Sequence, residues 1–142
     1  MSTVVGGELI IALRFASRPE RLKLVRTVVG EAARASGCSE KCVRDMVIAV
    51  DEACQNVIRH AYRGEPDGEN TLEISRDGDR IEFDLVDFAE PVDPETVKPR
   101  DIDDLRPGGL GTLFISECMD ESGFRTPPAG AGNRLWMAKR IE

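Results

Sequence analysis

The sequence is poor in the residues from which metal sites and disulfide frameworks are built. It contains one histidine and four cysteines, Cys38, Cys42, Cys54 and Cys118. Cys38 and Cys42 are four positions apart, but no second pair follows, whereas a structural zinc site needs four such ligands. We therefore expect the cysteines to be reduced thiols and not zinc ligands.

Runs of positive charge and long apolar segments are also missing. The net charge is −7 and no basic run occurs, which argues against sequence-independent binding to nucleic acid or to anionic lipid. No apolar stretch approaches the length of a membrane span, and the first residues lack the basic end and apolar core of a signal peptide. The sequence predicts one domain over residues 1–142, in the cytoplasm, without direct contact with nucleic acid or membrane.

Apolar periodicity and turn residues predict an α/β sandwich. The predicted elements are a strand over 8–15, a helix over 17–35 opened by a Ser17-Arg-Pro-Glu20 capping box, a helix over 39–62, a hairpin of strands 71–76 and 80–87 around Asp77-Gly78, a loop over 89–111, a helix over 112–120 and a strand over 132–139. This order favours one antiparallel or mixed sheet covered on one face by a layer of helices.

The second predicted helix carries an unusual polar stripe. Glu52, Asn56 and His60 are spaced by four, so each lies above the last, about 6 Å apart. Small residues, Ala49 and Ala53, flank the stripe. A carboxylate, a carboxamide and an imidazole in one row suit a site where a cation or a phosphate lies against a helix. An ordinary amphipathic helix with mixed polar residues remains the alternative.

Asp87 is the second candidate. It shares one face of the predicted strand 80–87 with Ile81, Phe83 and Leu85. A carboxylate on an apolar face must be paired or solvated, because its burial alone is costly. It is either a strand-end residue emerging into a loop or a ligand-binding acid, and we favour the acid.

The predicted loop over 89–111 is long and rich in Pro, Asp and Gly. Loops of this length inside a compact domain are usually functional or mobile, and we expect this one to become ordered when a ligand binds. It ends in Arg106-Pro-Gly-Gly-Leu-Gly111 before a predicted helix. Glycines at a helix start let backbone N–H groups face a phosphate, although flexible turns have the same composition.

Three motifs in this order resemble the GHKL ATPase superfamily, which has the Bergerat ATP-binding fold, and within it the anti-sigma factor serine kinases of the RsbW and SpoIIAB type. The motifs are Asp51-Glu-Ala-Cys-Gln-Asn56 with His60-Ala-Tyr62, then Leu85-Val-Asp-Phe-Ala-Glu-Pro-Val-Asp-Pro94, and then Pro107-Gly-Gly-Leu-Gly111. The resemblance extends from about Leu9 to the C-terminus.

The resemblance implies roles for individual residues. Glu52 would be the general base, Asn56 would ligate Mg²⁺ at the phosphates of ATP, and Asp87 would accept a hydrogen bond from the adenine amine. The residues implied in nucleotide binding are Asn56, Arg59, His60, Asp87, Ala89, Arg106, Gly108, Gly109, Leu110, Gly111 and Thr112.

The resemblance also implies an activity and partners. The expected protein is an ATP-dependent serine/threonine kinase, a homodimer, that sequesters a sigma factor and phosphorylates a STAS-type anti-anti-sigma protein. Ala89 and Pro91 stand where the superfamily usually has glycines, which motivates the alternative of a catalytically weak or inactive nucleotide-binding interaction module. The catalytic domain of a two-component histidine kinase is disfavoured, because the only histidine lies inside the helix motif.

Overall fold

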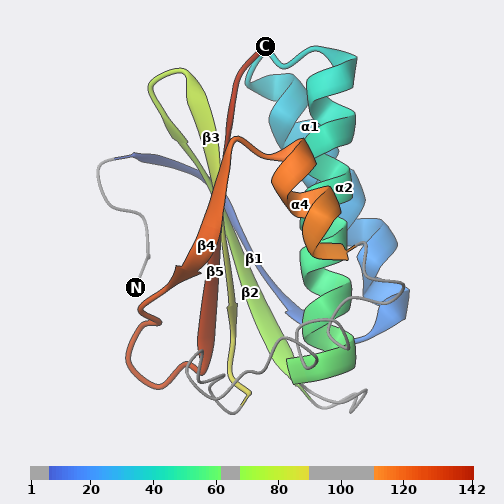
Figure 1. The fold of residues 1–142 in the computed structure, drawn as a ribbon, viewed down its shortest axis with the longest axis vertical. Coiled ribbons are helices and arrows are strands. Elements are labelled where there is room, and N and C mark those ends of the chain that lie inside the picture. Colours follow the sequence, from blue (N-terminus) through green and yellow to red (C-terminus); the bar gives the residue numbers. More distant parts are fainter. Residues whose placement is uncertain (1–6, 62–67, 90–110) are drawn as a thin grey trace.

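The computed structural model describes residues 7–61, 68–89 and 111–142. Within these ranges the elements are β1 (Glu8–Ala16), η1 (Pro19–Arg21), α1 (Leu22–Ala35), α2 (Glu40–Asn56), η2 (Val57–Ala61), β2 (Glu69–Asp77), β3 (Arg80–Asp87), α4 (Gly111–Cys118), β4 (Glu121–Arg125) and β5 (Asn133–Arg140). The strands form one antiparallel sheet in the order β1-β2-β3-β5-β4, and the helices cover one face of it (Figure 1). The predicted α/β sandwich is confirmed.

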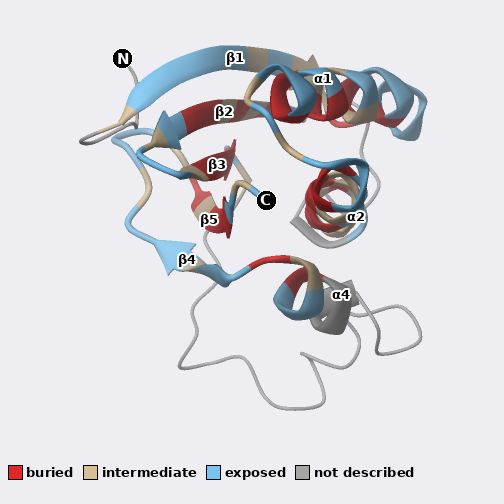
Figure 2. Ribbon diagram, turned by 90° about the horizontal axis from the view of Figure 1, so that it is seen from above, coloured by how far each residue is buried: buried red, intermediate tan, exposed pale blue. Residues whose placement is uncertain are grey.

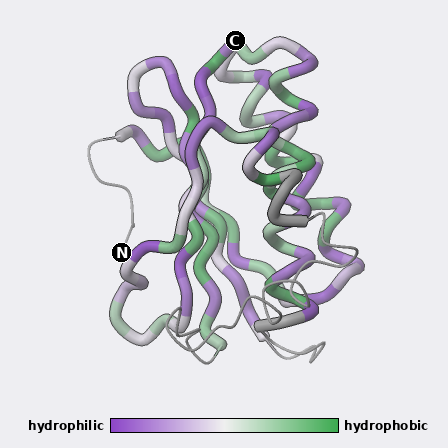
Figure 3. The backbone as a smooth tube through the Cα atoms, in the orientation of Figure 1, coloured by the Kyte–Doolittle hydropathy of each residue, from purple (hydrophilic) through white to green (hydrophobic). Residues whose placement is uncertain are grey.

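The core lies between this sheet and the helices. Buried residues are concentrated on β2, β3 and β5 and on the inner sides of α1 and α2, whereas β1 and β4 are largely exposed (Figure 2). Hydropathy alternates along the strands and helices, as expected for elements with one buried face (Figure 3). Among the largest fully buried side chains are Met46 on α2 and Phe83 on β3. No helix in the described ranges is both long and apolar enough to cross a membrane.

Two local predictions are wrong, and one strand was not predicted. Ser17 does not cap a helix: its backbone N–H bonds to the Gly68 carbonyl at 2.8 Å, and the chain enters η1 through Arg18 without a side-chain cap. β4 was not predicted, because its sequence Glu-Ser-Gly-Phe-Arg shows no apolar alternation and it is held mainly by pairing with β5. The helix that follows Ser39 is regular only to Asn56 and continues as the π-helical η2.

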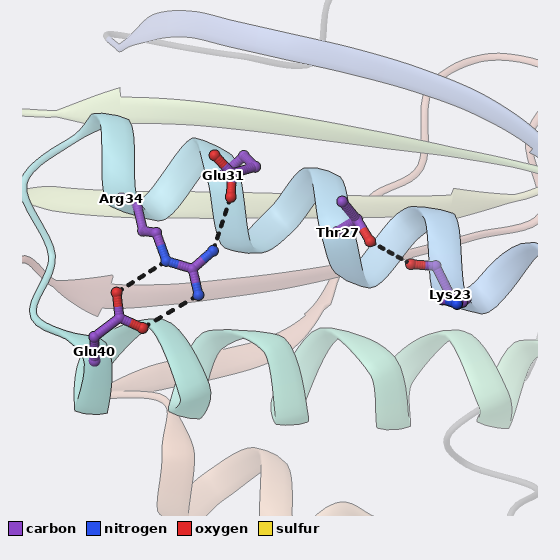
Figure 4. A network of polar contacts seen from close by, with 5 residues as sticks. All are labelled: Lys23, Thr27, Glu31, Arg34 and Glu40. Carbon is purple, nitrogen blue, oxygen red and sulfur yellow. Dashed lines mark hydrogen bonds and ion pairs between the residues drawn. The ribbon is translucent and has the colours of Figure 1, made fainter.

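Ion pairs connect α1 and α2 along their outer sides. Arg34 contacts Glu31 on its own helix at 2.9 Å and Glu40 at the start of α2 at 2.9 Å (Figure 4). All three side chains are largely exposed, so these pairs orient the helix ends more than they stabilise the fold. A second, less exposed contact joins Arg26 of α1 to Asp51 of α2 at 3.0 Å.

The four cysteines are free thiols. Burial raises the pKa of Cys54 to about 12, and burial followed by a hydrogen bond with Cys42 raises the pKa of Cys38 to about 12. Thiols with such pKa values are protonated at neutral pH, so they are poor nucleophiles and poor metal ligands.

Candidate functional site

Glu52 and Asn56 lie on one side of the last turns of α2, as their spacing predicts. Both residues are partly buried. No side chain in the described part of the protein hydrogen-bonds or ion-pairs with the Glu52 carboxylate. The Asn56 Oδ1 atom is buried and lacks a hydrogen-bond partner. Burying an acceptor oxygen without a hydrogen-bond partner costs about 1–3 kcal/mol of folding free energy, and binding of a positively charged ligand would recover it.

The neighbouring stripe of α2 has a structural role instead. Asp51 accepts hydrogen bonds from Arg26 of α1 at 3.0 Å and from Gln55 at 2.7 Å, and Arg59 donates to Gln55 at 2.7 Å. Asp51 is therefore committed to joining α1 to α2, whereas the adjacent Glu52 is left available. The Arg59 side chain is exposed and contacts Gln55. Its implied role in nucleotide binding stays a prediction.

The backbone changes geometry directly after Asn56. A π-helical segment contains more residues in each turn than an α-helix, so the stripe spaced by four does not continue regularly to His60. Single π-helical turns within α-helices are frequent at functional sites. The side chain of His60 lies outside the described side chains.

Asp87 lies at the end of β3 and is only 4% exposed. Its Oδ1 atom accepts hydrogen bonds from Asn133 Nδ2 on β5 at 3.0 Å and from the Ala89 backbone N–H at 3.1 Å. Burial raises the pKa of Asp87 above its usual range, and these two donors lower it in part. The side chain is thus a buried acid in a fixed orientation, and not a strand-end residue directed into solvent.

Gly132 lets two strand ends approach beside Asp87. Its N–H donates to the Asp87 carbonyl at 2.8 Å. A Cβ atom at this position would overlap the carbonyl oxygen of Ala89 and lie 2.8 Å from its carbonyl carbon. The close approach keeps Asn133, the next residue, within reach of the Asp87 carboxylate.

Further unpartnered polar atoms lie at the same end of the fold, where β1 and β3 end and β2 and β5 begin (Figure 1). They are Ser17 Oγ and both side-chain amide atoms of Asn70. Ser17 is 1% exposed and Asn70 is 0% exposed. Sequence reasoning missed Asn70, Asn133 and Ser17 as site candidates. The only available signal was the position of a polar residue on an otherwise apolar strand face. Asn70 on β2 has such a position, as Asp87 has on β3.

The rest of the predicted site lies outside the described residues. Arg106, Gly108, Gly109 and Leu110 belong to the segment 90–110. Gly111 and Thr112 are described by their backbone alone, which forms the start of α4. Two clefts on the described surface are lined by other residues, one between α1 and α2 and one beside the β3–β5 pair near Arg140.

The residues present fit a nucleotide with a divalent cation. A carboxamide oxygen with no internal partner, next to a carboxylate, is a hard oxygen donor set of the kind that Mg²⁺ prefers. Mg²⁺ usually keeps several waters and takes few ligands from the protein, so one or two protein oxygens suffice. Within the described residues no cluster of three His, Cys, Asp or Glu side chains exists that could hold a metal by itself.

Comparison with known proteins identifies the family of the chain. The sequence profile of the histidine kinase-like ATPase domain matches residues 15–139, and the chain belongs to this family. Membership of an ATPase family implies use of ATP, in line with the prediction.

Named relatives narrow the class. The chain is 35% identical over 119 residues to the serine-protein kinase RsbW of Listeria monocytogenes, covering 78% of this chain and 76% of the relative. It is 32% identical over 130 residues to the serine-protein kinase RsbW of Bacillus velezensis, covering 85% and 79%. The prediction of an anti-sigma factor kinase of the RsbW type is confirmed at the level of the family.

A solved structure supports the fold. The crystal structure of the RsbU and RsbW domains of a Mycobacterium tuberculosis protein matches 92% of this chain with a TM-score of 0.64. The two sequences are 16% identical, and the match covers 32% of that longer chain.

Proposed function

We propose that this protein binds MgATP at the end of the helix–sheet interface and transfers the γ-phosphate to a serine or threonine of a STAS-type anti-anti-sigma protein. One observation carries the proposal: the available Glu52 carboxylate and the unpartnered Asn56 oxygen share a helix stripe at the end of the molecule where Asp87 is buried. Phosphoryl transfer needs positioning, charge neutralisation and a proton acceptor. These side chains can supply the positioning and the proton acceptor, and a divalent cation held by Asn56 would supply the neutralising charge.

Each residue has a distinct part in this mechanism. Asp87, which is acceptor-only when ionised, holds the exocyclic amine of adenine and is itself held by Asn133 and Ala89. Asn56 would provide a ligand for Mg²⁺, and the bound cation would neutralise charge on the phosphates. Glu52 accepts the proton of the attacking hydroxyl. Gly109, Gly111 and the start of α4 would offer backbone N–H groups to the phosphates.

The proposed partners follow from the relatives, which are RsbW kinases. We infer that the protein also sequesters a sigma factor in the cytoplasm. Its net charge of −7 is complementary to the basic DNA-binding surfaces of such a partner. The proposal is tested by calorimetric titration with MgATP, followed by transfer of labelled γ-phosphate to a cognate anti-anti-sigma protein. Absence of nucleotide binding at millimolar concentration would contradict it.

Asp87→Asn is expected to weaken nucleotide binding by about 1–3 kcal/mol, roughly 5–150-fold in Kd, because the charge-assisted acceptor is lost. Burial raises the pKa of Asp87 in the folded state, so the ionised carboxylate destabilises the nucleotide-free protein above that pKa. The variant should therefore keep or increase its melting temperature at neutral pH, and this gain should shrink in acid. Calorimetry and thermal unfolding measure the two effects, and unchanged ATP affinity would exclude Asp87 from the adenine site.

We also propose a homodimer formed along β1. This strand is an edge of the sheet, and Leu9, Ile10 and Ile11 on it are 37–43% exposed. An exposed apolar edge strand is a template for pairing with another chain. Ile10→Lys is expected to shift the protein to a monomer in light scattering, whereas Leu24→Lys, at a 65% exposed site on α1, should not. A monomeric wild type at all concentrations would contradict this proposal.

A further inference from the structure

The helix-facing side of the sheet is organised in rows of residues that are opposite one another in the strand register. One row is entirely leucine and consists of Leu13, Leu72, Leu85 and Leu135. The next row, two residues along each strand, consists of Phe15, Asn70, Asp87 and Asn133. Across β2, β3 and β5 the sheet face therefore changes from apolar to polar within one step, at the end where the proposed nucleotide site lies.

Asn70 is the least explained member of the polar row. It is opposite Asp87 in the register of β2 and β3, where Cβ atoms are typically about 4.5–5.5 Å apart. An amide with a purely structural role would donate to that carboxylate. Instead Asp87 Oδ1 is engaged by Asn133 from β5 and by the Ala89 backbone, and neither amide atom of Asn70 has a partner among the described residues.

Ser17 adds a hydroxyl beside Asn70. Its backbone N–H bonds to Gly68, two residues before Asn70, and Phe15 is opposite Asn70, so Ser17 and Asn70 are diagonal neighbours. The Ser17 Oγ atom is also buried and unpartnered. Leaving such groups unpaired costs free energy that an apolar side chain, as in the adjacent leucine row, would avoid. Native proteins rarely keep such a cost without a use.

We propose that Asn70 and Ser17 are base-recognition residues of the nucleotide site, which deepens and rests on the function proposed above. An ionised Asp87 can only accept hydrogen bonds, so it matches an exocyclic amine but not the acceptor nitrogens of a purine ring. The Asn70 amide and the Ser17 hydroxyl supply donors next to it. They contact the polar edge of the base, directly or through one enclosed water. The ligand class is an adenine nucleotide, and the contact concerns the base and not the phosphates.

The test is calorimetric titration of the full chain with ADP, once with excess Mg²⁺ and once in a chelator, beside thermal unfolding without nucleotide. Asn70→Leu, a change of similar volume, is expected to lower ADP affinity on the order of 10-fold, by the same factor in both conditions. Its melting temperature without nucleotide should be unchanged or higher, because two unpaired polar atoms are removed. Thr71→Val is the matched control, since Thr71 follows on β2 with its side chain on the opposite, partly exposed face.

The outcomes separate this inference from the proposed function. Wild-type protein that binds no ADP would contradict both. If the wild type binds ADP and Asn70→Leu binds it with unchanged affinity, only the inference is overturned. A lower melting temperature of Asn70→Leu without nucleotide would also overturn it, because the Asn70 amide would then have partners in the free protein. Ser17→Ala deletes one oxygen and cannot overfill the site, so it repeats the test if Asn70→Leu does not fold. A loss of ADP affinity in that variant supports the inference, and unchanged affinity overturns it.

Discussion

Glu52→Gln is expected to lower phosphate transfer by about 10²–10⁴-fold, the usual contribution of a general base, while nucleotide and partner binding persist. The physical reason is the division of roles along α2. Asp51 is committed to Arg26 and Gln55, whereas Glu52 has no polar partner in the described residues and can receive a proton. Glutamine keeps the size of the side chain and removes only this capacity.

Asn56→Ala changes the other candidate residue on the same stripe of α2 and should affect nucleotide binding, which Glu52→Gln should not. The variant loses the unpartnered oxygen proposed to hold Mg²⁺, so nucleotide affinity and transfer should fall together in the presence of the metal. Without Mg²⁺ the affinities of the variant and the wild type should be similar. Glu31→Gln, the same exchange as Glu52→Gln at an exposed position of α1, should leave transfer unchanged. Near wild-type transfer in Glu52→Gln would remove Glu52 from the catalytic role.

Gly132→Ala is expected to have the largest effect on the fold near the site. The added methyl group would overlap the Ala89 carbonyl, so the end of β3 and the start of β5 must separate. Such overpacking typically costs about 1–3 kcal/mol, which corresponds to roughly 2–12 °C in melting temperature for a chain of this size. The separation also removes the hydrogen bond from Asn133 to Asp87, so nucleotide affinity should decrease as well.

A matched glycine makes the comparison specific. Gly123 on β4 has open space where a Cβ atom would lie, and Gly123→Ala should change neither stability nor nucleotide affinity appreciably. Thermal unfolding and ADP titration of the two variants give the result. Equal melting temperatures for Gly132→Ala and wild type would show that the strand ends can separate at little cost, and would contradict the proposed rigidity of the Asp87 site.

Sequence patterns determined those parts of the protein in which each element is amphipathic by itself. The apolar spacing on α1 and α2 and the alternation in β3 predicted the helices, the hairpin and their buried faces. The stripe containing Glu52 and Asn56 and the apolar-face position of Asp87 were also visible, because local periodicity decides which residues share a side.

Only the tertiary structure decided the features that depend on pairing between distant segments. β4 has a weak strand sequence and is held mainly by pairing with β5. Ser17 was predicted as a helix cap, but its N–H is engaged by Gly68, more than fifty positions away in the chain, and its hydroxyl is left buried. Asn70 and Asn133 join Asp87 in one polar row through strand register alone. The register of β2 against β3 is fixed by the two-residue turn Gly78-Asp79, and that of β5 against β3 by how the strands pack, so local propensity at Asn70 or Asn133 does not reveal the row.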